Sequence, residues 1–190
     1  MATTTRLCLA GNEKANELLR TNPLTLLIGM LLDHQALVER AYAAPYELAR
    51  RLYTELDATA VAAQPIEEIE SCFRQPPALH RCPGMMARRV HALCTHLVHH
   101  HGGEVTSLWR GAVDAREVYR NVRALPGFTD RTARVLIALL GKQMAVRPAG
   151  WQDVAGPYAL PGHRSIADVT DRESLYRVRA YSRQHAMMSV

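Results

Sequence analysis

The chain has 190 residues, of which 48% are hydrophobic and 22% are charged. This length and composition allow a sizeable core and exclude a disordered tail or a fibrous protein. The formal net charge is +5, and residues 1–73 carry 6 basic and 10 acidic side chains, whereas residues 74–190 carry 17 and 8. Of the 23 basic residues, 21 are arginine. This balance favours an anionic partner, such as nucleic acid or a membrane surface, although a solvated arginine-rich face has the same composition.

The cysteines and the apolar segments bound the class of protein further. Cys8, Cys72, Cys82 and Cys94 are separated by 64, 10 and 12 residues, which is not the paired short spacing of a zinc or iron–sulfur site. The N-terminal segment is not apolar enough for a signal peptide, and the longest apolar run, Leu24–Leu32, is too short to span a membrane. We therefore expect a cytoplasmic protein with free thiols and no metal.

The first half of the chain has helical periodicity and no sustained strand alternation, which predicts an all-α fold. Asn12 is a candidate N-cap, and Thr21-Asn22-Pro23 supplies a break followed by a proline suited to the first turn of a helix. The helix after Pro23 is apolar nearly all round and should lie in the core. Helices are expected over Glu13–Arg20, Leu24–Asp33, Ala36–Ala43, Tyr46–Leu56 and Pro65–Phe73.

The second half continues in helices. They are expected over 84–101, Ala115–Arg123, Arg131–Leu140 and Asp171–His185, with a short turn at Leu108-Trp109. Gly141 is expected to close the third of these helices. Residues 147–164 are rich in glycine and proline, which predicts an ordered loop or a lid.

About five residues join Ala115–Arg123 to Arg131–Leu140, so these two helices should form an antiparallel hairpin. Pro126 and Gly127 turn the chain tightly, Phe128 fills the space between the helices, and Thr129 or Asp130 can cap the second helix. The backbone N–H groups at that helix start, beside Arg123, Arg131 and Arg134, could bind a DNA phosphate without reading a base. An ordinary helix-to-helix turn is the alternative.

Three segments in order resemble the helix-hairpin-helix superfamily of base-excision DNA glycosylases, which includes endonuclease III and the adenine glycosylases. Pro23–Gln35 resembles its core helix and the glutamine near the displaced base, 83–105 resembles the helix before the hairpin, and Leu125–Gln143 resembles the hairpin. The resemblance spans about residues 22–147 and is nearest to a compact actinobacterial-type subfamily without an iron–sulfur cluster. It implies a two-lobed helical bundle, with one lobe at about 22–111 and the other formed by 1–21 and 112–190.

The resemblance implies a monomer that binds double-stranded DNA, associates with the nucleoid and takes part in base-excision repair. It implies no cofactor except, as one option, a monovalent cation at the hairpin turn. The base pocket or its wedge would be formed by Gln35 and Trp151, although Trp151 is more simply explained as an anchor for the proline- and glycine-rich loop. The expected DNA contacts are Gly127, Phe128, Thr129, Arg131, Thr132, Arg134 and Arg88.

Departures from the family pattern bear on the mechanism. Thr129 stands where the family hairpin has a second glycine, and Arg131 stands where bifunctional members have a nucleophilic lysine. An arginine stays protonated and cannot form a Schiff base, so lyase activity is not expected. Arg147 and Pro148 occupy the place of the family's catalytic aspartate. Asp153 and Asp33 are then the candidate catalytic residues, and a chain without a catalytic carboxylate is the alternative.

Three functions remain open. The first is a monofunctional DNA N-glycosylase that flips a damaged base and hydrolyses its glycosidic bond. The second is a catalytically inactive module that binds lesions or DNA structures on the same fold, and the third is a helical protein-interaction domain. His96 and His100 have helical metal-ligand spacing but are more simply explained as polar residues at a helix end. The sequence does not identify the base that is recognised.

Overall fold

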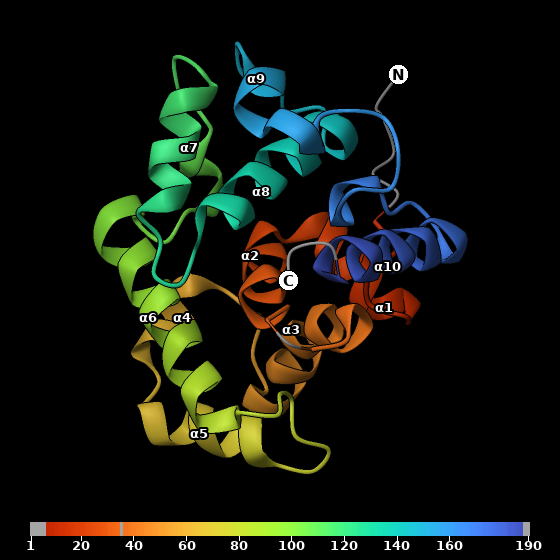
Figure 1. Cartoon of the computed structure of the whole chain (residues 1–190). Coiled ribbons are helices and arrows are strands. Elements are labelled where there is room, and N and C mark those ends of the chain that lie inside the picture. The colour runs from red at the N-terminus through yellow and green to blue at the C-terminus, as the bar shows by residue number, and fades with distance from the viewer. Residues whose placement is uncertain (1–6, 35, 188–190) are drawn as a thin grey trace. The chain divides into compact units, whose positions relative to one another are not determined.

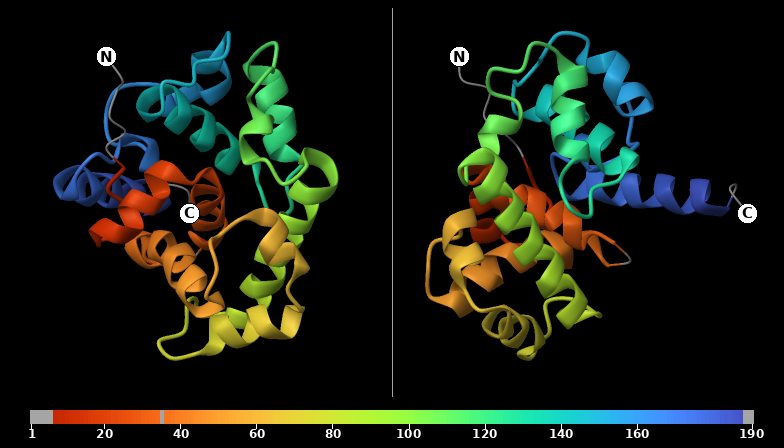
Figure 2. Two further views of the ribbon diagram at one scale, coloured as in Figure 1. Left: turned by 180° about the vertical axis from the view of Figure 1, so that it is seen from behind. Right: turned by 90° about the vertical axis from the view of Figure 1, so that its left-hand side faces the viewer.

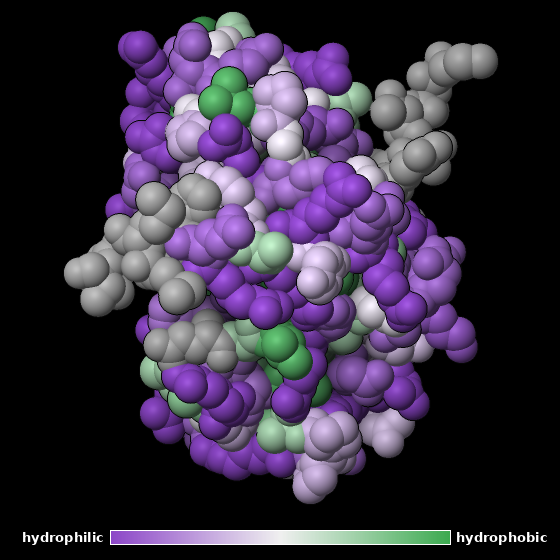
Figure 3. All heavy atoms as spheres, turned by 45° about the vertical axis from the view of Figure 1, so that its right-hand side comes forward, coloured by the Kyte–Doolittle hydropathy of each residue, from purple (hydrophilic) through white to green (hydrophobic). Residues whose placement is uncertain are grey.

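The computed structural model describes residues 7–34 and 36–187, and within these ranges the chain forms helices and no strand (Figure 1). The expected all-α class is therefore confirmed. No helix in the described ranges has both the length and the apolar character needed to cross a membrane. On the face drawn in Figure 3, hydrophilic residues predominate and apolar ones occur in small groups.

Contacts divide the described residues into two compact units, which we call the N-terminal unit (10–108 and 125–128) and the C-terminal unit (7–9, 109–124 and 129–187). The helix Glu13–Thr21 belongs to the N-terminal unit. The turn between the two hairpin helices belongs to the N-terminal unit.

The N-terminal unit is organised around α2 (Pro23–Leu32), which packs against α1 (Glu13–Thr21), α3 (Val38–Leu52) and α6 (Pro83–His101). All residues of α2 after Pro23 are buried, as its apolar sequence predicts. The remaining helices, α4 (Ala58–Ala63) and α5 (Ile66–Arg74), pack against α6, which the 3₁₀ helix η1 (Val105–Leu108) follows. The expected Asn12 cap is confirmed, because its side chain accepts a hydrogen bond from the N–H of Ala15 at 2.8 Å.

The expectation of separate helices at Ala36–Ala43 and Tyr46–Leu56 was wrong, because α3 runs through Pro45 without a break. A proline inside a helix removes one backbone hydrogen bond. Burial of Tyr42, Pro45 and Leu48 offsets this loss, and Tyr42 packs directly on α2. A Cβ atom on Gly29 would lie 2.5 Å from Cδ1 of Tyr42, so only glycine permits this contact. The short helix α4 was also not anticipated.

The C-terminal unit is built on α8 (Asp130–Gln143), which packs against α7 (Ala115–Arg123) and α9 (Trp151–Ala155), as the views of Figure 2 show. It also contacts η2 (Gly156–Tyr158) and η3 (Ile166–Asp168), and α10 (Arg172–Met187) packs on η3. Residues 135–141 of α8 are all buried. The expected helical hairpin partners α7 and α8 are thus neighbours.

The end of α8 and the segment that follows it differ from what the sequence predicts. The helix continues past Gly141 to Gln143, because Gly141 lies against the Trp151 ring and not at a terminus. A Cβ atom on Gly141 would lie 2.5 Å from Cε3 of Trp151. The left-handed residue after α8 is Ala145, with φ 55°. The expected loop over 147–164 contains α9 and η2, so much of it is short helix.

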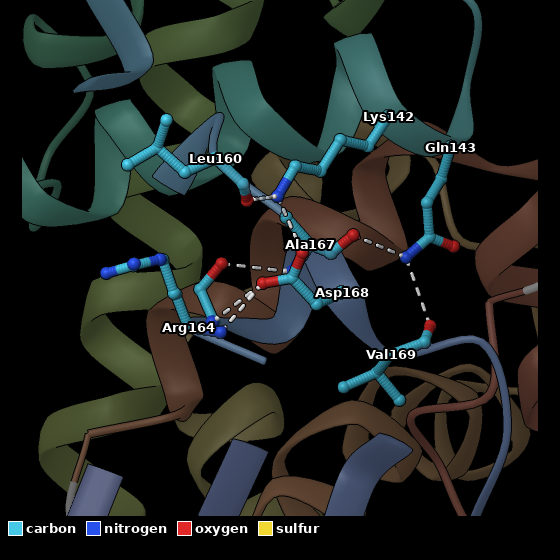
Figure 4. A network of polar contacts seen from close by, with 8 residues as sticks. Lys142, Gln143, Leu160, Arg164, Ala167, Asp168 and Val169 are labelled. Atoms are coloured by element: carbon cyan, nitrogen blue, oxygen red, sulfur yellow. Dashed lines mark hydrogen bonds and ion pairs between the residues drawn. The ribbon is translucent and has the colours of Figure 1, made fainter. Parts of the chain in front are cut away.

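A polar network joins the last turn of α8 to η3 (Figure 4). The Lys142 ammonium lies 2.6 Å from Oδ1 of Asp168 and donates to the carbonyl of Leu160 at 2.8 Å. The other Asp168 oxygen accepts from the N–H groups of Arg164 and Ser165. Beside this pair, Gln143 Nε2 donates to the carbonyls of residues 167 and 169. The network fixes the segment after η2 onto α8.

Candidate nucleic-acid interface

The turn before α8 has the geometry that its sequence predicts. The N–H of Phe128 donates to the carbonyl of Leu125 at 3.2 Å, and Gly127 has φ +83°. Pro126 followed by a residue of positive φ is the pattern of a type II turn, which requires glycine at the third position. A Cβ atom on Gly127 would also lie 2.6 Å from Cδ1 of Leu31. Phe128 is 4% exposed, so its ring packs inside the protein.

Thr129 caps α8 from an extended backbone with φ −92°. Its Oγ1 accepts from the N–H of Thr132 at 3.2 Å, and the hydroxyl groups of these two residues are 2.9 Å apart. A glycine is therefore not needed at this position. The first helical bond runs from Ala133 N to the Thr129 carbonyl, so the N–H groups of Asp130 and Arg131 have no partner within the helix. Arg131 is exposed.

Asp130 carries a negative charge in the first turn of α8. It accepts hydrogen bonds from the Tyr119 hydroxyl at 2.6 Å and from Nε of Arg134 at 3.0 Å. These two bonds lower the pKa of the Asp130 carboxyl, and the same contact with Asp130 raises the pKa of Tyr119. The ionised carboxylate interacts favourably with the helix dipole and opposes an anion at the same N–H groups. A phosphate near this end would depend on the exposed guanidinium of Arg131.

Arg134 links three helices of the C-terminal unit. Besides its bonds to Asp130, its Nη1 donates to the carbonyl of Val154 on α9 at 2.8 Å, and its guanidinium lies 5.6 Å from the centre of the Tyr119 ring on α7. The side chain is 37% exposed. Two of its nitrogens, Nε and Nη1, thus donate inside the protein, although the sequence suggested a DNA contact.

Arg88, another expected DNA contact, lies on α6 in the N-terminal unit. Its Nε lies 2.7 Å from Oε1 of Glu70, while its side chain stays 71% exposed. Hydrogen bonds from Arg74 and the charges of Arg74 and Arg88 lower the pKa of Glu70. Arg88 is therefore ion-paired on one side and open to solvent on the other.

A pocket of about 270 Å³ lies within the C-terminal unit, and it includes one of the candidate catalytic residues. Asp153 in α9 is exposed and lines this pocket with groups from α7 and α8. The walls therefore present a carboxylate beside guanidinium groups. This combination can accept hydrogen bonds from a polar ligand and donate hydrogen bonds to it. The lining residues are Arg116, Tyr119, Arg134, Asp153 and Val154.

The other candidate residues lie in different surroundings. Asp33 is the C-cap residue of α2 in the N-terminal unit, where its N–H donates to the Gly29 carbonyl at 2.9 Å. Burial, and to a lesser degree the charge of Asp33, raises the pKa of Tyr42. Gln35 lies outside the described residues. Trp151 is half-buried against Gly141, which is the position of an anchor for the segment after α8.

Arg147, which stands where the resemblance expects a catalytic aspartate, has a contact of its own. Its Nε donates to the carbonyl of Gly141 at 2.9 Å. The last carbonyl groups of a helix have no partner within it and carry partial negative charge, so a guanidinium there stabilises the end of α8. This position serves the fold in a way that a carboxylate would not.

The histidines at the end of α6 lie close together with their rings tilted relative to one another. The rings of His96 and His100 are 4.4 Å apart between centres, and His101 Nδ1 lies 3.0 Å from Oγ of Ser107. Burial, followed by the neighbouring histidines, lowers the pKa of His96 and His101. In the part of the chain that the structure describes, no three His, Cys, Asp or Glu side chains gather in a way that could hold a metal ion.

Sequence reasoning missed the cluster of Tyr119, Asp130 and Arg134. The spacing of four between Asp130 and Arg134 signals a helical ion pair, but the part played by Tyr119 depends on how α7 packs against α8. No protein-family model matches this chain, and no curated protein or solved structure matches it significantly.

Proposed function

We propose that this protein binds double-stranded DNA through the hairpin of α7, the Leu125–Phe128 turn and α8, and that it is a monofunctional DNA N-glycosylase. The observation that carries the proposal is the glycine-dependent turn directly before a capped helix, which leaves two backbone N–H groups without helical partners. Such a helix start suits a phosphate oxygen.

Arginines near both sides of the turn supply the charge for this interface. Arg120 and Arg123 lie in the last turn of α7, Arg131 lies in the first turn of α8, and all three are exposed. Contacts of this kind hold the DNA backbone without reading its sequence. Because Asp130 offsets part of the charge, Arg131 is the residue whose loss should weaken binding most.

The proposed reaction is hydrolysis. Water forms a bond to C1′ of the deoxyribose, the N-glycosidic bond breaks, and the base leaves with a proton, so the product is an abasic site. Asp153 is the residue proposed to accept the proton of the attacking water, since it is exposed at a pocket that also offers hydrogen-bond donors. Arg131 stands where bifunctional members of the glycosylase superfamily have a nucleophilic lysine. Because an arginine cannot form a Schiff base, cleavage of the DNA strand is not proposed.

A second candidate is a module on the same fold that binds damaged DNA without cutting the glycosidic bond. The contact of Arg147 with the Gly141 carbonyl favours it, because the position expected for a catalytic carboxylate is used to stabilise α8. The two candidates share the DNA interface and differ only in chemistry.

The test is a set of duplex oligonucleotides, each with one damaged base, incubated with the protein and then cleaved by alkali at any abasic site. Base release that Asp153→Asn abolishes supports the glycosylase, provided that the control Glu104→Gln, at an exposed carboxylate between α6 and η1, retains it. Binding without release by the wild-type protein supports the second candidate.

Binding is tested with Arg131→Ala, with Arg110→Ala as the control beyond the opposite end of α7. Gly127→Ala is not suitable, because its positive φ and the nearby Leu31 side chain predict a disturbed turn. Equal duplex affinity of the Arg131 and Arg110 variants and the wild-type protein would exclude the hairpin as the interface and leave the helical protein-interaction domain.

A further inference from the structure

The last helix, α10, has a basic and aromatic stripe that the proposed function does not use. Arg172, Tyr176 and Arg183 recur at spacings of four and seven residues. In an α-helix these spacings place side chains along one face. Arg172 and Arg183 are exposed, and Tyr176 is 69% exposed. The stripe runs along about 16 Å of helix, at 1.5 Å per residue.

Other faces of α10 are used by the fold, whereas the three stripe residues are exposed. Leu175 and Val178 are buried, and α10 packs on η3. Tyr181 receives a hydrogen bond from Nη1 of Arg164 at 3.2 Å, and the Arg164 guanidinium lies 5.8 Å from the centre of its ring. These contacts hold the helix in one orientation, so the stripe is a defined surface.

The acidic groups near the stripe are already engaged. Glu173 forms an ion pair with Arg177, which lies off the stripe. The Asp171 carboxylate accepts from the N–H of Ser174 at 2.7 Å, which lowers its pKa and caps the helix. Neither carboxylate is therefore available to neutralise Arg172 by a direct pair. The surface presents net positive charge with an aromatic ring in its middle.

We propose that this stripe binds single-stranded nucleic acid, with the arginines on the phosphates and Tyr176 stacked on an unpaired base. Arginines bind phosphate groups in two-point geometry, and an aromatic ring stacks on any base. A duplex hides its base faces, so the exposed ring favours a single strand. The inference goes beyond the hairpin and does not depend on it, since the groups involved lie on α10 alone.

The experiment measures binding of the full chain to fluorescent dT20 and rU20 over a range of salt concentrations. Removal of two phosphate contacts in Arg172→Ala/Arg183→Ala should reduce the slope of log K against log salt by about 1.4, at about 0.7 per phosphate. Tyr176→Ala should weaken binding at least about fivefold, and Tyr176→Phe should restore it. The matched Arg177 control, the double variant Glu173→Gln/Arg177→Ala, removes a neutral ion pair on the same helix and should change the affinity by less than twofold.

Three results would overturn the proposal. One is an unchanged salt slope in the double variant with a wild-type circular dichroism spectrum. Another is equal loss of affinity in the Arg177 control. The third is Tyr176-dependent binding to vesicles of anionic lipid without binding to either oligonucleotide. Failure of Arg131→Ala to affect duplex binding would refute the hairpin interface and leave these outcomes unchanged, so the two proposals fail separately.

Discussion

The ion pair between Lys142 and Asp168 leads to a stability prediction that can be worked from the structure. The Asp168 side chain is 6% exposed and that of Lys142 is 18% exposed. Asp168→Asn keeps the shape of the side chain and removes its charge. The ammonium of Lys142 then stays largely buried beside neutral oxygens only, those of the Leu160 carbonyl and the new side-chain amide, with no negative charge to compensate it.

Removing one partner of a buried pair costs about 3–5 kcal/mol, because the remaining charge is desolvated without compensation. The partial exposure of Lys142 places this variant at the lower end, about 3 kcal/mol. A change of 1 kcal/mol lowers Tm by roughly 2–4 °C in a chain of this size, so the expected fall is about 6–12 °C.

The assay is urea and thermal unfolding followed by circular dichroism, with Glu173→Gln as the control. That carboxylate belongs to an exposed ion pair on α10, and such pairs contribute about 0.3–0.5 kcal/mol. Lys142→Met and the double variant complete a cycle with an expected coupling of about 1–3 kcal/mol. A loss below about 0.5 kcal/mol in Asp168→Asn, or no coupling in the cycle, would refute the assignment of this network to the stability of the fold.

Three further predictions concern local geometry and pH. Ala145→Gly should raise the free energy of unfolding by roughly 0.5–1 kcal/mol, because φ is positive at this residue. The control Ala92→Gly, on the exposed side of α6, should lower the free energy of unfolding by about 1 kcal/mol. Chemical unfolding of both variants measures the two changes. Gly141→Ala should lower the free energy of unfolding by about 1–3 kcal/mol, because the new methyl group overlaps the Trp151 ring. The near-ultraviolet circular dichroism spectrum of the variant should also change. An unaltered spectrum together with unaltered stability would contradict this packing. The pKa of Asp171 is lowered in the folded protein, so its ionised carboxylate stabilises the fold above the unfolded pKa of about 3.9, and this stabilisation is lost as the pH falls through the folded pKa. The difference in unfolding free energy between the wild-type protein and Asp171→Asn should therefore shrink below about pH 4. A difference that stays constant down to pH 2 would contradict this prediction.

Local signals in the sequence were sufficient for most helices. Asn12 was expected to cap one helix and Thr129 or Asp130 another, and the side chains of Asn12 and Thr129 each accept a hydrogen bond from the turn that follows. The apolar run after Pro23 correctly predicted a buried helix. The Pro126-Gly127 pair correctly predicted a tight turn. These features depend on groups within a few residues of one another, so the chain itself determines them.

Local signals failed where a distant segment changed the balance. Pro45 and Gly141 both predict a helix end, yet burial of the first and the contact of the second with Trp151 keep their helices continuous. Neither the burial of Pro45 nor the Trp151 contact can be predicted from neighbouring residues, because both depend on how segments distant in the chain pack. Tertiary packing supplies more free energy than the lost hydrogen bond or the glycine propensity costs.

The candidate site divides in the same way. The sequence by itself determined the positive second half and the hairpin turn with its neighbouring arginines. Only the tertiary structure decided that Arg134 bonds to Asp130 and to α9, that Arg147 stabilises the end of α8, and that Asp153 faces a pocket. The physical reason is that the bonds an arginine makes depend on the carbonyls and carboxylates that packing brings within about 3 Å.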